Sequence, residues 1–497
     1  MFANLSPHLA PLQVVIPLIA APLSLFLRNA TAAWLFALVA TWSAFVIACL
    51  LLVQVLDQGV LSYALGGWPP PWGIEYRLDA ANAPVLVIVS GIGAAVMTYA
   101  RQGILAEIEK HNQALFFPVF LLALAGLLGV TITGDAFNLF VFLEISSLST
   151  YVLVSLGANR DKRALSAAIS YLIAGTIGAT FFVIGIGLLY MATGTLNIMD
   201  LAMRIADMGD SRLVRAAFAF IIVGIGLKLA LFPLHLWLPN AYTFAPSAVT
   251  VFIAATSTKV AVYVLMRFVF TVFGTRFDFQ ELTLSYLFLP LALVGMFVPS
   301  IVAVFQTNVK RLLAYSSIAQ IGYMLLGLSF ATIAGLTAAS IHLFNHALMK
   351  GALFMAVGAV ALRMGSTDID AFTGLGRKMP WTMAAFVAGG LSLIGLPLTV
   401  GFVSKWLLIE AAFASGQWWI AGFVVMSSLI AVIYVWRVVE LAYLHDTPEH
   451  VNVTEAPASV LVPMWGLVLA NFYFGINAQF TTSVARRAAE ALLGVFP

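Results

Sequence analysis

The chain alternates between long apolar runs and short polar breaks along almost its whole length. About 20 apolar residues in a helix cross the hydrocarbon core of a bilayer. The polar breaks separate fourteen such runs, at 9–27, 32–56, 80–99, 114–133, 136–157, 164–191, 214–238, 247–273, 284–305, 312–330, 333–361, 381–413, 416–442 and 458–478. The pattern therefore predicts an all-α, polytopic membrane protein with about 14 transmembrane helices.

Composition supports this class and excludes others. Hydrophobic residues make up 62% of the 497 residues and charged residues only 9%, whereas soluble domains carry about 25% charged residues. The single cysteine, Cys49, excludes a disulfide framework within the chain and a cysteine-based metal site. The first apolar run lacks the flanks of a cleaved signal peptide, so we expect it to remain as a membrane helix. Little sequence follows the last run, and we expect no soluble domain there.

The loop charges predict an orientation, because Lys and Arg favour the cytoplasmic side. One set of alternate loops holds 12 of these residues: Arg28, Arg101, Lys110, Arg160, Lys162, Arg163, Lys310, Arg311, Arg363, Arg377, Lys378 and Arg437. The other set, with the tail, holds 8: Arg77, Arg204, Arg212, Arg215, Arg267, Arg276, Arg486 and Arg487. We therefore expect the first set to be cytoplasmic and both termini to lie outside, in a bacterial inner membrane.

Half of the eight lysines lie inside the apolar runs, namely Lys228, Lys259, Lys350 and Lys405. A charged residue at the centre of a membrane helix costs about 2.5–3.5 kcal/mol on insertion scales. Lysine changes its protonation readily when buried, and arginine in effect does not. The use of lysine at depth therefore suggests groups that titrate. For Lys259, the alternative is a side chain that reaches to an interface.

Two of these lysines lie near a proline: Lys228 precedes Pro233 by five residues, and Lys405 follows Pro397 by eight. Proline interrupts a helix, and a membrane protein tolerates the break where protein or water satisfies the freed carbonyls. Such breaks mark ion sites in transporters. Their separation by five spans favours inverted repeats, roughly spans 4–8 and 9–13. A simple packing kink is the alternative.

Further polar residues fall at membrane depth. Asp135 is a good N-cap for the fifth span, and Glu144 lies nine residues on, about 13 Å further in. His342, His346 and Lys350 recur at i, i+4 and i+8, which places them on one helical face. Proton transfer along these groups is one interpretation, and a structural hydrogen-bond network or haem ligation by histidine is the alternative. Asp135, His235 and Glu410 are candidate accessory groups.

Five stretches together resemble a known family. "GDAFNLFVFLEISSLSTYVL", "GLKLALFPLHLWLPNAYTFAPSAV", "QTNVKRLLAYSSIAQIGYMLLG", "HLFNHALMKGALF" and "GLPLTVGFVSKW" are similar to signatures of the proton-conducting antiporter-like subunits of respiratory complex I and Mrp cation/proton antiporters. Within that family, "GGWPPPWGIEYRLD" and the chain length most resemble the D subunit of an Mrp antiporter.

The resemblance implies a fold and a set of roles. It implies two inverted five-helix repeats, broken seventh and twelfth helices, and a polar axis through the membrane centre. The segments would be an N-terminal one at 1–112, repeats at 113–275 and 280–445, and a last helix with its tail at 446–497. The implied proton path is Glu144, Lys228, Lys259, His342, His346, Lys350 and Lys405.

The function expected from these residues is transport without a covalent step. Protons would move along the axis while Na⁺ or another monovalent cation moves the opposite way, within a complex of several membrane subunits. We expect no cofactor, no metal site and no nucleic-acid partner. A proton-pumping subunit of complex I or of a membrane-bound hydrogenase is the alternative, and a scaffold with an inactive axis is a third possibility.

Overall fold

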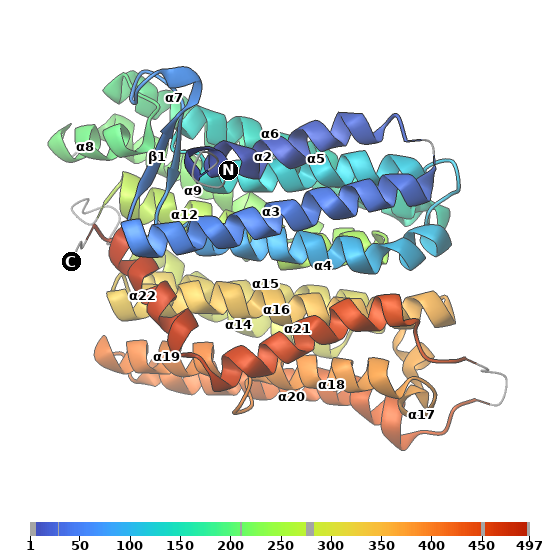
Figure 1. Ribbon diagram of the computed structural model, residues 1–497. Coiled ribbons are helices and arrows are strands. Elements are labelled where there is room, and N and C mark those ends of the chain that lie inside the picture. Colours follow the sequence, from blue (N-terminus) through green and yellow to red (C-terminus); the bar gives the residue numbers. More distant parts are fainter. Residues whose placement is uncertain (1–5, 28, 209–210, 275–282, 449–452, 495–497) are drawn as a thin grey trace.

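The computed structural model describes residues 6–27, 29–208, 211–274, 283–448 and 453–494. Arg28 and Arg276, which contribute to the predicted orientation, lie outside this part of the chain. The described residues form a bundle of long, roughly parallel helices, and the all-α polytopic class is confirmed (Figure 1). The first half of the chain occupies one side of the bundle and the second half the other.

The N-terminal segment contributes three membrane helices and a small hairpin. After a short 3-10 turn, η1 (Ser6–His8), come α2 (Leu9–Ser24), α3 (Ala30–Gln58) and α4 (Ala83–Glu107). The antiparallel hairpin of β1 (Leu61–Ala64) and β2 (Glu75–Leu78), with η2 (Leu65–Gly67) after β1, lies between α3 and α4. The hydropathy pattern predicts only a loop here. Pairing of the two strands satisfies the backbone groups of this connection.

The first repeat starts at α5. It comprises α5 (Gln113–Ile132), α6 (Ala136–Ser155), η3 (Leu156–Asn159), α7 (Arg163–Thr193), the surface helix α8 (Ile198–Met208), α9 (Arg212–Leu229), α10 (Trp237–Phe244), α11 (Ser247–Ala255), α12 (Ser257–Met266) and the π-helical turn η4 (Arg267–Val272). The seventh membrane helix is broken between α9 and α10, as the sequence predicts. The eighth is also broken, between α11 and α12, where the sequence predicts one continuous span.

The second repeat follows the same order. It comprises the π-helical turn η5 (Leu284–Phe288), α14 (Leu289–Val304), α15 (Val309–Ser329), α16 (Ile333–Met364), η6 (Ile369–Phe372), α17 (Leu375–Lys378), α18 (Pro380–Ile394), α19 (Val400–Ala414) and α20 (Trp419–Leu444). The twelfth membrane helix is broken between α18 and α19, again as predicted. The chain then continues into α21 (Ala458–Ile476) and α22 (Gln479–Leu492), an amphipathic helix that was not predicted from the sequence.

A shared local structure relates the two repeats. Asp135 caps α6 and pairs in a β-bridge with Asn197, whereas Asn308 caps α15 and pairs in a β-bridge with Asp368. In each repeat the first residue of the capped helix donates its N–H across this bridge, over 2.8 Å. The first bridge adjoins the β hairpin, because Gly134 donates to the carbonyl of Glu75. The second adjoins the opposite end of the bundle, so the repeats are inverted.

Candidate functional site

Lys228 and Glu144 form an ion pair beside the first helix break. Lys228 is the penultimate residue of α9, and its Nζ lies 3.2 Å from Oε1 of Glu144 on α6. Lys228 Nζ also donates to the hydroxyl oxygen of Ser147, one helical turn further along α6, over 2.7 Å. The side chains are 9% and 24% exposed, respectively. The pair is thus largely withdrawn from the protein surface, and both charges have a partner.

The break itself is built from a left-handed residue and an indole contact. Ala230 has φ 58°, which ends α9 directly after Lys228 and Leu229. The carbonyl of Leu227 accepts from the N–H of Ala230 over 3.2 Å and from Nε1 of Trp237, at the start of α10, over 2.9 Å. Pro233 lies in the exposed part of the break. The break therefore leaves Lys228 at the C-terminal end of α9. The negative partial charge of a helix C-terminus favours a cation there.

A small cavity of about 40 Å³ adjoins Lys228. Its polar lining includes the hydroxyls of Ser147 and Thr150 on α6 and of Ser257 at the start of α12. A cavity of this kind needs roughly 10–15 Å³ for each water molecule, so this one has room for about three. It extends from the ion pair to α12, which carries Lys259 two residues after Ser257.

Lys259 is fully buried and does not reach an interface. Its Nζ donates to the carbonyl of Ala254, at the end of α11, and lies 3.3 Å from the hydroxyl of Thr258. The break at Thr256 exposes the last carbonyls of α11, and the ammonium occupies that position. Burial of a lysine without a carboxylate partner is costly, which keeps Lys259 among the candidate functional residues.

The predicted stripe on α16 is present and buried. The rings of His342 and His346 stack with centroids 6.1 Å apart, and both residues are 0% exposed. Nδ1 of His342 lies 2.8 Å from the hydroxyl of Ser404 on α19. Neither ring nitrogen of His346 has a hydrogen-bond partner among the described residues. The carbonyl of Leu313 on α15 accepts from Nζ of Lys350 over 2.9 Å.

Lys405 binds carbonyl groups at the second helix break, as Lys259 does at the end of α11. Its Nζ donates to the carbonyls of Leu393 and Ile394, the last two residues of α18, over 3.0 and 2.8 Å. The hydroxyl of Ser428 accepts a third hydrogen bond over 2.9 Å. The Lys405 ammonium also lies 5.0 Å from the ring centroid of Tyr323, whose ring faces His342 at 5.6 Å.

The contacts of the three accessory candidates, Asp135, His235 and Glu410, are with residues outside the predicted proton path. Asp135 accepts from the N–H of Asn138 and caps α6, and burial raises its pKa despite this hydrogen bond. His235 stacks on Phe232, with centroids 5.2 Å apart. Glu410 is exposed and accepts from Nε1 of Trp406. Within the described ranges, no three His, Cys, Asp or Glu side chains gather closely enough to hold a metal ion.

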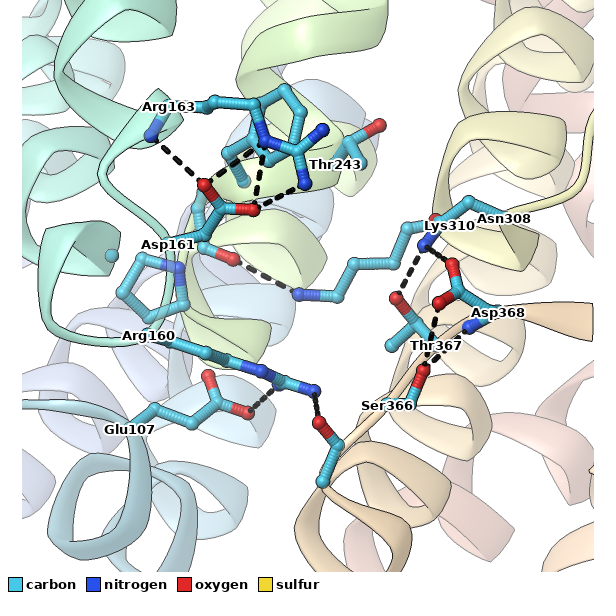
Figure 2. Close-up of a pocket in the computed structure, with 15 residues that line it drawn as sticks. Glu107, Arg160, Asp161, Arg163, Thr243, Asn308, Lys310, Ser366, Thr367 and Asp368 are labelled. Carbon is cyan, nitrogen blue, oxygen red and sulfur yellow. Dashed lines mark hydrogen bonds and ion pairs between the residues drawn. The ribbon is translucent and has the colours of Figure 1, made fainter. Parts of the chain in front are cut away.

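A polar pocket of about 230 Å³ opens at the end of the bundle where the Asn308 bridge lies (Figure 2). Its lining includes Glu107, Arg160, Lys310 and Asp368. Glu107 and Lys310 are only 5% and 2% exposed. Glu107 was not among the residues predicted from the sequence, and Lys310 was assigned to a loop. Glu107 lies eight residues beyond the predicted run at 80–99, and its partners are distant in sequence, so no local signal marked it.

Comparison with known proteins identifies relatives of the whole chain. The sequence model of a protein family described as "NADH:quinone oxidoreductase/Mrp antiporter, TM" matches residues 133–431. NADH-quinone oxidoreductase subunit N of Desulforudis audaxviator is 40% identical, over 97% of this chain and 99% of the relative. The D subunit of the Na⁺/H⁺ antiporter of Bacillus subtilis is 30% identical, over 97% of this chain and 96% of the relative.

Two solved structures have the same fold over nearly the full length. A chain of the membrane-bound sulfane sulfur reductase, an archaeal respiratory membrane complex, superposes with a TM-score of 0.90 at 31% identity, and 97% of each chain is covered. A chain of the Mrp complex from Dietzia superposes with a TM-score of 0.89 at 25% identity, and 98% of each chain is covered.

Proposed function

Because the chain belongs to the NADH:quinone oxidoreductase/Mrp antiporter transmembrane family, we propose that it is the proton-translocating subunit of a multisubunit Na⁺/H⁺ antiporter. One observation carries the proton-transfer part of this proposal. Lys228 and Glu144 form an ion pair at a helix break, next to a cavity with room for water. Such an arrangement holds a proton on an amine and offers it a hydrated exit.

The proposed cycle begins with opening and closing of that pair. When Glu144 faces Lys228, the carboxylate stabilises the ammonium by charge and by a hydrogen bond. When the pair opens, the buried ammonium lacks its counter-charge, and release of the proton to the cavity is favourable. Ser257 in the cavity wall then leads to Lys259. In this proposal the break at Ala230 supplies the freedom for Lys228 to change partner.

The second half of the proposed path lies on α16 and α19. Helix α12, which carries Lys259, packs on α16, which carries His342, His346 and Lys350. A proton that reaches the stacked histidines has Ser404 as the next hydrogen-bonding group. Lys405 and Tyr323 close the series on the far side. Every step is a proton exchange between adjacent polar groups, and no covalent intermediate forms.

The antiporter assignment is supported by the relatives that are D subunits of such antiporters and by the likeness to the Mrp complex from Dietzia. Other membrane subunits would be its partners, and Na⁺ is the proposed driving cation. The proposed location is a bacterial inner membrane with both termini outside, and the excess of Lys and Arg in one set of loops supports this orientation.

A second candidate is a proton-pumping subunit of a redox-driven complex of the complex I type. The observation that favours it is the 40% identity to NADH-quinone oxidoreductase subunit N over nearly the full chain. The same buried lysines serve either complex, because the proton path does not depend on what drives it. The two candidates differ in their partners, which are antiporter subunits in the first and redox subunits in the second.

The deciding experiment uses membrane vesicles from an antiporter-deficient strain that expresses the chain with its neighbouring partner genes. The proposal predicts that added Na⁺ collapses an imposed pH gradient, and that a strain without this one gene shows no collapse. If Na⁺, K⁺ and Li⁺ all leave the gradient unchanged while iron–sulfur or flavin subunits co-purify with the chain, the redox-driven candidate is correct instead.

A further inference from the structure

Helix α11 is short, and a buried charged side chain from outside the helix binds each of its ends. At its start, the N–H of Ser247 donates to Oε2 of Glu107 over 2.5 Å, and the Ser247 hydroxyl donates to Oε1 over 2.7 Å. At its end, the carbonyl of Ala254 accepts from Nζ of Lys259. A carboxylate at the N-terminus and an ammonium at the C-terminus both complement the helix dipole.

We infer that Glu107 is a positioning residue for Lys259, acting through α11. By holding the start of α11, Glu107 sets the place where the carbonyl of Ala254 receives the lysine ammonium. The inference rests on the proposed function only in that it gives Lys259 a part in proton transfer. Glu107 itself is 5% exposed and lies at the end of α4, outside the set of residues proposed as the proton path.

The connection between the two ends is stiff. Nine helical residues span about 13 Å, and hydrogen bonds between backbone groups four residues apart join successive turns. Thr250, in the middle of α11, donates its hydroxyl to the carbonyl of Tyr242 over 2.9 Å. The hydroxyl of Tyr242 in turn lies 3.4 Å from the carbonyl of Ile253, near the other end. A displacement of the start of α11 is therefore transmitted, almost undiminished, to the end of the helix that binds Lys259.

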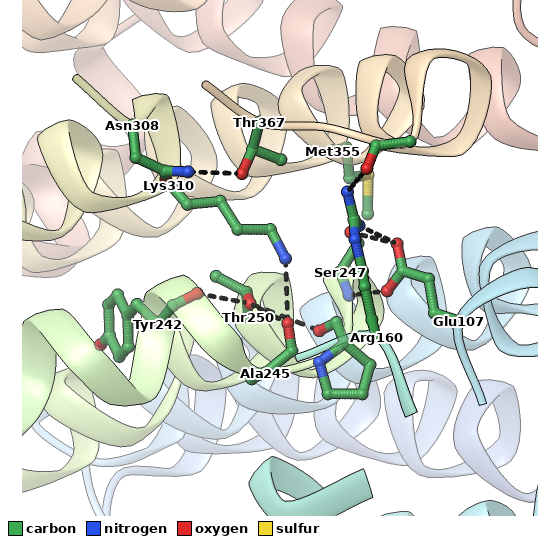
Figure 3. Close-up of polar contacts among 12 residues, drawn as sticks. Glu107, Arg160, Tyr242, Ala245, Ser247, Thr250, Asn308, Lys310, Met355 and Thr367 are labelled. Atoms are coloured by element: carbon green, nitrogen blue, oxygen red, sulfur yellow. Dashed lines mark hydrogen bonds and ion pairs between the residues drawn. The ribbon is translucent and has the colours of Figure 1, made fainter. Parts of the chain in front are cut away.

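Arg160 links this arrangement to the second repeat (Figure 3). Its guanidinium lies 3.4 Å from Oε1 of Glu107 and donates to the carbonyl of Gly365, at the end of α16, over 2.6 Å. Lys310 on α15 adds a second link, because it donates to the carbonyl of Ala245 over 2.9 Å. Movement of α16, which carries the histidine stripe, is thereby coupled to the start of α11.

The test compares three variants of the chain in its assembled complex. Glu107→Gln keeps the size of the side chain and removes its charge, Glu107→Asp keeps the charge, and Glu109→Gln changes an exposed carboxylate two residues away. We expect the first to lower proton transport about tenfold, because hydrogen bonds to a buried charged group are strong. We expect Glu107→Asp to restore the rate to within about threefold of the wild type, and Glu109→Gln to leave it unchanged.

Hydrogen–deuterium exchange in the same samples tests the link to Lys259. Amides of residues 254–259 should exchange faster in Glu107→Gln and return towards the wild-type rate in Glu107→Asp. Unchanged exchange there would overturn the inference, as would a Glu107→Gln transport rate within twofold of the wild type. If Glu107→Gln does not assemble, Ser247→Ala decides in its place. It removes one of the two hydrogen bonds to Glu107, and wild-type transport and exchange in that variant would overturn the inference.

Glu144→Gln serves as a separate arm. It should abolish transport and leave the exchange of residues 254–259 unchanged. Wild-type transport in Glu144→Gln would refute the proposed function, whereas the exchange result would still decide whether Glu107 positions the end of α11.

Discussion

The ammonium of Lys405 donates a hydrogen bond to the carbonyl of Ile394, the last residue of α18, over 2.8 Å. The helix break thus leaves a carbonyl without its usual helical partner, and the lysine supplies the missing donor. Gly395 makes the break possible, because its φ of 93° is a conformation that side-chain-bearing residues rarely adopt. A break and a buried lysine therefore stabilise one another at this position.

Replacement of Lys405 by arginine tests whether this residue contributes only a positive charge or must also release a proton. Arginine keeps a positive group near the Leu393 and Ile394 carbonyls but does not give up its proton. We expect a complex that assembles normally and transports protons at less than about a tenth of the wild-type rate. Transport is measured in vesicles, and assembly by native gel electrophoresis. The exposed Lys378→Arg is the matched control and should transport normally, whereas an active Lys405→Arg would show that Lys405 need not titrate.

His346 offers a test in which packing is preserved. Its ring stacks on His342, and its nitrogens have no hydrogen-bond partner among the described residues. His346→Phe keeps a ring of similar size and removes the groups that carry a proton, so we expect transport to fall by about 10²-fold, the lower end of typical acid–base contributions. The melting temperature should not fall, because no hydrogen bond within the described structure is lost. His111→Phe, at an exposed loop, should change neither quantity.

A buried ion pair near the β hairpin tests stability rather than transport. Arg267 donates to Oδ1 of Asp79 over 2.7 Å, and both side chains are less than 10% exposed. Burial alone would raise the pKa of Asp79, but the charge and hydrogen bond of Arg267 outweigh it and lower that pKa. The pair is therefore intact at neutral pH. Its stabilising effect is complete above the ordinary pKa of aspartate and is lost as the pH falls through the lowered value.

Asp79→Asn should destabilise the protein by about 3–5 kcal/mol at neutral pH, because it leaves Arg267 buried without a counter-charge. The measurement is thermal unfolding in detergent, followed by the fluorescence of the purified chain or complex. Asp57→Asn removes an exposed carboxylate at the end of α3 and should leave the melting temperature unchanged. Equal melting temperatures for the two variants would contradict the role given to this pair.

The sequence predicted the membrane helices well, because their apolar runs are long and the bilayer fixes their length. It also located the breaks near Pro233 and Pro397, since proline marks them directly. The break at Thr256 went unpredicted because no proline or glycine marks it, and contacts such as the Lys259–Ala254 hydrogen bond stabilise it instead. Arg267 was assigned to a loop, yet it is buried, because its partner Asp79 is distant in sequence.

The sequence predicted the charged residues of the candidate site but not the hydroxyl groups that bind them. A buried lysine is unusual in an apolar run, and each of the four therefore stands out in the sequence. Ser147, Ser404 and Ser428 do not, because serine is common in membrane helices and only the fold places them against a charge or a ring nitrogen. Glu107 was not selected as a candidate from the sequence, because its partner Ser247 lies 140 residues away and only the fold brings the two together.

The most direct test of the proposed mechanism is proton transport by Glu144→Gln in an assembled complex. Glutamine retains the shape of the side chain and a hydrogen-bond acceptor for Lys228, but it removes the charge that holds the proton there. With complex levels matched by quantitative blotting, we expect cation-driven collapse of the pH gradient to fall to the level of vesicles that lack the chain. Transport by Glu144→Gln at the wild-type rate would contradict the mechanism.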